Sequence, residues 1–298
     1  MKPFTFLIVL VLLTSSTYGQ STTPSFTEEA LKKEIDRNLN TPSTAEGTLT
    51  LRSKTNSKGV TYSGAYFSTP WTKALAEQLA NGAIQNTKDL FDEAFLIDAN
   101  GNVPNGEGTI QFSDGIVKGT FVNGWLHGMG EQEYNHEHKD HPYIRENQSG
   151  DYQYNLLNGK GQLTFVFRNG NTVYYRGNFI DALEDGKIIM ETHYVNAEKD
   201  GDPYKLVATF DFKMGNGDGL MKLTRYYKNH PEVFEMGITE SDKKIGEWVG
   251  HTIVKGKKVY FKLEYQDDEM VSSPSQIEEL DYKLKAYDIQ MKGFTYQE

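Results

Sequence analysis

A segment rich in glycine and aromatic residues repeats along the chain, and this repeat limits the possible folds more than any other feature. KGTFVNGWLHGMG at 118–130 returns as SGDYQYNLLNGKG at 149–161, RGNFIDALEDGKI at 176–188 and VATFDFKMGNGDG at 207–219, and in more diverged form as MGITESDKKIGEW at 236–248. The corresponding positions are 31, 27, 31 and 29 residues apart: Gly119, Gly150, Gly177, Ala208 and Gly237. Self-similarity at such a period indicates stacked copies of one small structural unit.

Each unit has the pattern of a β-hairpin. The first strands carry apolar residues at alternate positions, as in Ile110 and Phe112, and the second strands do likewise, as in Tyr175 and Phe179. A period of two is typical of strands with one apolar face. Tight hairpin turns need residues that accept positive φ, and these occur at Ser113–Gly115, Asn123–Gly124 and Asn169–Gly170. We therefore predict a mainly β fold, an elongated antiparallel meander of repeated hairpins.

Glycine also recurs in the middle of the predicted strands, on the aromatic face. Gly64, Gly119 and Gly177 are examples. A missing side chain weakens a strand but leaves a slot for a neighbouring ring. We therefore expect an aromatic ring from the adjoining segment to cover a glycine in each hairpin. The glycines with a predicted structural role in the repeat are Gly64, Gly108, Gly119, Gly128, Gly130, Gly150, Gly159, Gly161, Gly177, Gly217 and Gly219.

The pattern of Tyr or Phe, Asp/Asn-Gly, Gly-x-Phe/Tyr and Gly-x-Gly resembles the MORN repeat. It matches best at 106–130, then at 149–186 and 207–219, and more loosely at 47–66 and 237–263. The units are longer than the usual MORN repeat, and Ile188 and Ala208 stand where glycine is expected. The resemblance implies a single sheet of stacked hairpins. It also implies a scaffolding role or, in some members, contact with phospholipid headgroups.

The first residues have the pattern of a secretory signal peptide. Lys2 precedes the apolar run 4–13, and Thr17 and Gly19 suit cleavage before Gln20. The run is shorter than the roughly 20 residues that a membrane-spanning helix needs. We predict a signal peptide at 1–19, export to the periplasm or the outside of the cell, and no transmembrane segment. The chain has no cysteine, so disulfides and thiol chemistry are excluded.

Three helices are predicted outside the repeat. The first, 25–39, lies in an N-terminal helix and linker at 20–45, and Thr69 with Pro70 starts a second helix in an insertion at about 69–95. The β-repeat domain then covers 46–271, and a C-terminal capping helix and tail cover 272–298. The helix is predicted to begin around 273–276 and to end at Gly293, with apolar residues near one face: Ile277, Leu280, Leu284, Tyr287 and Met291. We expect these helices to cover the apolar face and edges of the sheet.

The charge of the chain bears on its partners. The formal net charge is −10 at pH 7, and loss of Lys2 with the signal peptide makes it one unit more negative. An acidic protein is repelled by nucleic acid and by anionic lipid surfaces, so neither is an expected partner.

Two groups of residues are candidates for binding. Trp125, Tyr152, Tyr175 and Phe179 could form an aromatic surface for a ligand or partner, or they could pack into the core. Trp125 lies beside a turn, where we expect its ring to be the most accessible of the four.

His136, His138 and His141 form the second group. With Glu137 and Asp140 they could hold zinc or copper, or they could belong to a solvated loop.

The sequence predicts no catalytic residue and no cofactor. The segment 98–109 has aspartate and asparagine spaced as in a calcium loop, but Val103 and Thr109 replace the required glycine and glutamate, so we expect a turn. The patterns of a nucleophile elbow and of a P-loop are absent. The favoured hypothesis is an exported, non-enzymatic scaffold that binds a protein. The alternative is a secreted carbohydrate-binding or glycan-hydrolysing protein with an aromatic face and paired carboxylates.

Overall fold

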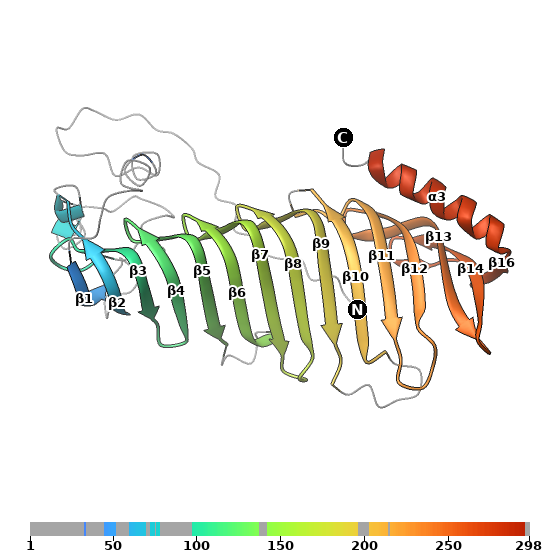
Figure 1. Cartoon of the computed structure of the whole chain (residues 1–298), viewed down its shortest axis with the longest axis horizontal. Coiled ribbons are helices and arrows are strands. Elements are labelled where there is room, and N and C mark those ends of the chain that lie inside the picture. The colour runs from blue at the N-terminus through green and yellow to red at the C-terminus, as the bar shows by residue number, and fades with distance from the viewer. Residues whose placement is uncertain are drawn as a thin grey trace. The chain divides into compact units, whose positions relative to one another are not determined.

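The fold is a β-sheet built from consecutive hairpins (Figure 1). The structure is a computed structural model, and it describes Lys33 and residues 45–51, 60–69, 72–74, 76–77, 97–136, 142–195, 203–213 and 215–295. The predicted signal peptide lies outside the described residues, and so does the predicted helix 25–39 apart from Lys33, which is helical. Among the helices of the described residues, none combines the length and the apolar character that crossing a bilayer requires.

Sixteen strands of the described chain form one open sheet, and β1 to β15 follow each other in sequence order, with β16 beside β14. This confirms the predicted mainly β fold and its antiparallel hairpin meander. The strands are β1 Ala45–Leu51, β2 Val60–Phe67, β3 Val103–Gln111, β4 Gly115–Val122, β5 Trp125–Asn135, β6 Tyr143–Gln153, β7 Leu156–Phe167, β8 Thr172–Ile180, β9 Leu183–His193, β10 Lys205–Phe212, β11 Gly219–Tyr226, β12 Val233–Glu240, β13 Lys243–Val254, β14 Lys257–Gln266, β15 Glu269–Met270 and β16 Ser275–Ile277.

The chain divides into two compact units, and the first comprises Met1–Gly108 and Phe121–Trp125. In this unit the Tyr62 ring is fully buried and meets the edge of Phe121, with 5.7 Å between ring centroids. Thr69 caps a helix as predicted, because its hydroxyl accepts a hydrogen bond from the Thr72 amide at 3.1 Å and its carbonyl accepts one from Lys73. Residues 72–74 and 76–77 are helical.

The second unit comprises Thr109–Thr120 and Leu126–Glu298, and its sheet carries apolar clusters on both faces. One face buries a cluster centred on Trp248 and Leu263. On the other face Met236, Ile238 and Val249 are covered by α3, the helix Glu279–Thr295. Figure 1 shows α3 lying across the last strands of the sheet.

The C-terminal helix differs from its prediction in two ways. It begins at Glu279, because Ser275–Ile277 pairs with β14 as β16 instead of forming the first turn. Its sheet-facing side is formed by Tyr282, Ala286 and Ile289.

The predicted apolar stripe of this helix faces away from the sheet, with its members 47–68% exposed: Leu280, Leu284, Tyr287 and Met291. Small residues explain why this side of the helix packs on the sheet. At Gly293 the helix lies so close to β11 that an added Cβ would be 2.8 Å from Leu220 Cβ. In this orientation Lys285 Nζ of the helix forms an ion pair with Glu247 Oε1 of β13, at 2.6 Å.

The strand glycines provide space in two ways. As predicted, a ring fills the slot at some of them: Tyr62 over Gly108, Phe179 over Gly161 and Trp248 over Gly237. The same prediction is wrong for Gly119 and Gly177, where no ring is among the nearest atoms. There a backbone carbonyl of the next strand, of Met129 or Lys187, would lie 2.6 Å from an added Cβ. Close approach of two strands therefore requires glycine at these two positions.

Candidate functional site

The four aromatic residues singled out from the sequence do not form an open surface. Trp125, Tyr152 and Phe179 are buried, and Tyr175 is half-buried. The expectation of an accessible Trp125 is wrong, since only 1% of its surface is exposed. As the first residue of β5 it enters the packed core directly after the turn. Burial, with a contribution from nearby Glu184, raises the pKa of Tyr175 to about 12, so this phenol stays neutral at physiological pH.

The histidine cluster is described only at His136, because His138 and His141 lie outside the described residues. The His136 ring meets the edge of Tyr143 at 5.1 Å between centroids, and its Nε2 lies 3.5 Å from Glu146 Oε2. Within the part of the chain that the structure describes, no three metal-binding side chains come together. The metal site stays a prediction.

The segment after β2 that has aspartate and asparagine at calcium-loop spacing is a turn, as expected. The Asp98 carboxylate accepts hydrogen bonds from the backbone amides of Asn100 at 2.9 Å and Asn102 at 2.7 Å, and from the Asn102 side chain at 2.8 Å. Its oxygens are used by the turn itself, which is the ordinary role of aspartate at such a position.

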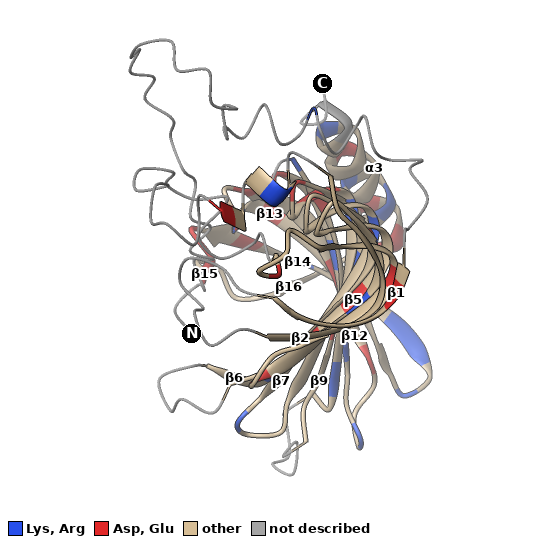
Figure 2. Ribbon diagram, turned by 90° about the vertical axis from the view of Figure 1, so that its left-hand side faces the viewer, with Lys and Arg blue, Asp and Glu red and all other residues tan. Residues whose placement is uncertain are grey.

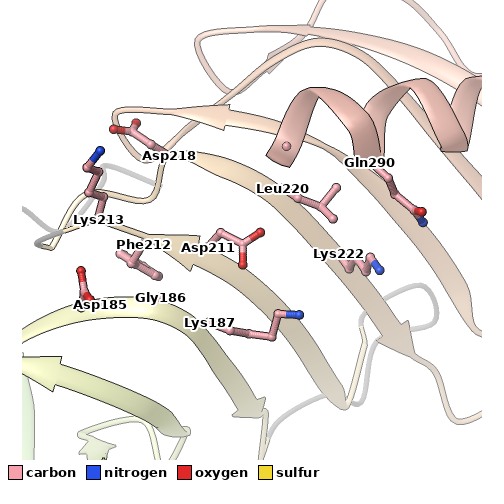
Figure 3. A pocket seen from close by; sticks show the side chains of 11 residues that line it. Asp185, Gly186, Lys187, Asp211, Phe212, Lys213, Asp218, Leu220, Lys222 and Gln290 are labelled. Atoms are coloured by element: carbon pink, nitrogen blue, oxygen red, sulfur yellow. The ribbon is translucent and has the colours of Figure 1, made fainter. Parts of the chain in front are cut away.

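A polar cavity of about 600 Å³ lies in the second unit, beside the C-terminal end of α3 (Figure 3). Strands β9, β10 and β11 form its floor, and Gln290 and Gly293 of α3 contribute to its wall. Three aspartates and three lysines line it: Asp185, Asp211, Asp218, Lys187, Lys213 and Lys222. Such a volume is within the range of small-molecule sites in proteins.

Asp211 is central to this cavity. Strand alternation places it on the face that α3 covers, directly paired in register with Lys187 of β9, while Lys222 of β11 pairs with Thr209 two residues away. Figure 3 shows Lys187 and Lys222 on the same side of the Asp211 carboxylate. The aspartate is only 7% exposed, and its Oδ1 has no hydrogen-bond partner.

The electrostatics of Asp211 reflect this position. Burial raises the pKa of its carboxyl group above the ordinary range. The ammonium groups of Lys187 and Lys222 and a hydrogen bond from the Leu220 amide oppose this shift without cancelling it. The site therefore holds a carboxyl group that lacks part of its hydrogen bonding, next to two cations.

A second charged group lies on the opposite face, within the cluster around Trp248. Arg225 Nη1 contacts Glu235 Oε1 at 2.7 Å, and both side chains are largely buried. The Lys244 ammonium lies 4.9 Å from the Trp248 ring and 4.6 Å from the Tyr265 ring. Burial lowers the pKa of Lys244, and the rings stabilise its charge by cation–π interaction. This arrangement fixes neighbouring strands to each other.

Sequence reasoning did not identify the Asp211 cavity. Its three central residues come from three different strands, and each is an ordinary charged residue in an alternating strand. The only signal in the sequence is an aspartate between two phenylalanines in the segment TFDF, and the relative register of β9, β10 and β11 is needed to bring Lys187 and Lys222 beside it.

Comparison with models of known protein families finds no match, and comparison with curated proteins finds no relative.

Proposed function

We propose that this protein is an exported, non-enzymatic scaffold of the MORN-like type, and that it binds a protein partner through the outer face of α3. The observation that carries the proposal is the apolar stripe of Leu280, Leu284, Tyr287 and Met291, which is exposed while the opposite face of the same helix is packed on the sheet. A contiguous exposed apolar surface on a well-packed element is typical of an interaction site.

The spacing of the stripe indicates the kind of partner. Steps of four, three and four residues are those of a coiled-coil seam, so the surface suits another helix with an apolar heptad pattern. The flanks carry opposite charges, Asp281 and Asp288 on one side and Lys283 on the other, and Figure 2 shows acidic and basic residues interspersed on α3. In a parallel pair of two α3 helices, Lys283 would face Asp288 of the second copy, whereas an antiparallel pair would bring the aspartates together. A second copy is therefore the simplest helix that fits.

The aromatic face gives less support to the rival function in glycan binding or hydrolysis. Trp125, Tyr152 and Phe179 are buried, so sugars would not reach these rings in this conformation. A glycan array and a panel of chromogenic glycoside substrates test the rival directly. Turnover of a substrate, or specific binding of neutral glycans, would favour it.

A photo-crosslinking experiment tests the scaffold proposal. The crosslinker is placed at position 284 in the mature protein, and at exposed Met129 in a matched control. We expect a specific protein adduct from 284 and none from 129. Sedimentation of the purified protein then shows whether the partner is a second copy.

The double variant Leu280→Gln/Leu284→Gln should abolish the adduct without lowering the melting temperature, because both side chains are solvent-exposed. Equal crosslinking from positions 284 and 129, or no adduct from either, would contradict the proposal.

A further inference from the structure

The cavity beside Asp211 has chemistry that the scaffold role does not use. It lies on the face of the sheet that α3 covers, next to the C-terminal end of this helix. A buried carboxylate oxygen without a hydrogen-bond partner is uncommon, because leaving such a group unsatisfied is unfavourable. Asp211 Oδ1 is such an oxygen, and Asp211 is one of the residues that line the cavity. A ligand that donates a hydrogen bond to this oxygen would satisfy it.

The ammonium groups of Lys187 and Lys222 are the second feature of the cavity that a ligand could contact. Among the described residues, no ion pair within hydrogen-bonding distance joins Lys187 or Lys222 to Asp211, although both ammonium groups act on it electrostatically. Although the three lysines and three aspartates of the whole lining balance, the two lysines that act on Asp211 give its immediate surroundings an excess of one positive charge. A ligand with a single negative charge would balance it, and lysine ammonium groups are good donors to carboxylates.

The remaining wall contributes apolar contact and an amide. Leu220 presents carbon surface, and Gln290 of α3 lines the cavity from above (Figure 3). Gly293 adds no side chain at the point where the helix closes over Leu220. A sugar ring with hydroxyl groups around its edge and C–H groups on its face fits such a wall, because small-ligand sites combine apolar surface with a few directed polar groups.

We propose that this cavity binds a uronic acid residue, a hydroxylated sugar ring with one carboxylate. The ligand carboxylate lies between the Lys187 and Lys222 ammonium groups, and a ring hydroxyl donates a hydrogen bond to Asp211 Oδ1. Leu220 contacts the C–H face of the sugar. This site is separate from the outer face of α3, and the proposal does not depend on the scaffold role.

Titration of the full mature protein with glucuronate, followed by NMR chemical shifts or calorimetry, tests the site. Concentrations up to about 50 mM are needed because a small ligand with few contacts binds weakly. Glucose serves as the probe without a carboxylate, and an oligouronide serves as the chain form. We expect saturable binding of glucuronate and no saturation with glucose. Tighter binding of the oligouronide than of the monomer would identify a polymer as the source of the residue, and equal affinities would identify the free sugar acid.

Variants locate the site. Lys187→Gln/Lys222→Gln should weaken glucuronate binding at least about tenfold, since both charge-assisted hydrogen bonds to the ligand carboxylate are lost. The single variants Lys187→Gln and Lys222→Gln should each weaken binding by less than the double variant, which guards against a double variant that does not fold. Lys257→Gln, at an exposed lysine of β14 outside the cavity, should leave affinity unchanged. The proposal is overturned if glucuronate does not saturate, if glucose binds equally well, or if the folded cavity variants bind like the original protein.

Discussion

The indole of Trp248 lies where a side chain on Gly237 of the adjacent strand would have to be placed. Trp248 is fully buried, and its Nε1 donates a hydrogen bond to the Ile245 carbonyl at 3.2 Å. The register of β12 and β13 shifts between Met236 and Ile238, so the glycine lies at the irregular point of the pair. The ring therefore uses the space of the glycine to join the cluster with Leu263 and Tyr265.

Replacing this glycine should be strongly destabilising. In Gly237→Ala the new methyl group overlaps the indole, and overpacking of a core typically costs about 1–3 kcal/mol. The matched control is Gly47→Ala, where the new Cβ would meet only Tyr66 Cε1 at 3.6 Å, an ordinary contact. Urea unfolding measures both variants. Similar losses of stability in the two would show that the slot at Gly237 has no energetic importance.

The strands of the repeat could be predicted from sequence more reliably than its turns. Asn123 and Gly124 have the positive φ angles that their sequence indicates, at 52° and 85°. Other hairpins turn on pairs without glycine, such as Tyr154–Asn155 and Asp181–Ala182, which also have positive φ. Strand pairing on both sides of such a turn compensates for the left-handed conformation, which costs roughly 1–2 kcal/mol per residue. Local sequence does not show this compensation.

Helix α3 shows a second limit of sequence reasoning. Its apolar residues form two stripes, one through Leu284 and one through Ile289, and periodicity alone favours the larger side chains. The structure packs the stripe with the smaller residues, because Ala286 and Gly293 allow the helix to lie close to the sheet. The cavity at Asp211 depends on this rotation as well as on the register of three strands, so neither could be derived from one repeat.

A side-chain hydrogen bond of Asn155 connects two consecutive hairpins, and this bond is missing at the corresponding place in the next hairpin. The Asn155 amide donates to the Leu126 carbonyl at 3.0 Å, and the Asn155 side-chain oxygen accepts from the Leu126 amide at 2.6 Å. Ala182 occupies the corresponding place in the next hairpin and makes only the backbone bond, to the Leu157 carbonyl at 2.8 Å.

The substitution Ala182→Asn should therefore stabilise the protein. Asparagine tolerates positive φ better than alanine, and its side chain could accept from the Leu157 amide as Asn155 does from Leu126. The expected gain is about 1 kcal/mol, measured as a rise in the urea midpoint. Ala182→Gly separates the two effects, because it relieves the strain at φ 66° without adding an acceptor. A gain from glycine at least as large as that from asparagine would contradict the proposed hydrogen bond.

The buried pair of Arg225 and Glu235 should be sensitive to the loss of one partner. Glu235→Gln leaves the Arg225 guanidinium and the nearby Lys244 ammonium without a compensating charge, and breaking a buried pair in this way costs about 3–5 kcal/mol. Glu247→Gln is the control, since Glu247 forms ion pairs with Lys262 and Lys285 at a more exposed position and should lose no more than about 1 kcal/mol. Urea unfolding compares the two variants, and equal losses would argue that the buried pair contributes little.

His251 should make the stability of the C-terminal region depend on pH. Its ring lies near Phe234 at 5.2 Å, Tyr260 at 6.1 Å and Tyr282 of α3 at 6.0 Å between centroids, and its Nδ1 is buried without a hydrogen-bond partner. Burial lowers the pKa of His251, Lys258 lowers it further, and Glu232 opposes the shift. The unfolded chain then binds a proton more readily than the folded protein does. The contribution of His251 to stability is therefore complete above the unfolded pKa of about 6.5, and it is lost as the pH falls from there towards the lower folded pKa.

The variant His251→Gln isolates this contribution, because it removes the titrating group while the other ionisable residues remain. Unfolding free energies of both proteins are measured between about pH 7.5 and pH 5, on either side of the ordinary histidine pKa. We expect the original protein to lose more stability than the variant over this interval. The raised pKa values of Glu184 and Asp211 act in the opposite direction, since an acid that holds its proton more tightly when folded stabilises the protein at lower pH. These residues are present in both proteins, so their effect cancels in the difference. Parallel pH profiles would show that protonation of His251 is not coupled to unfolding.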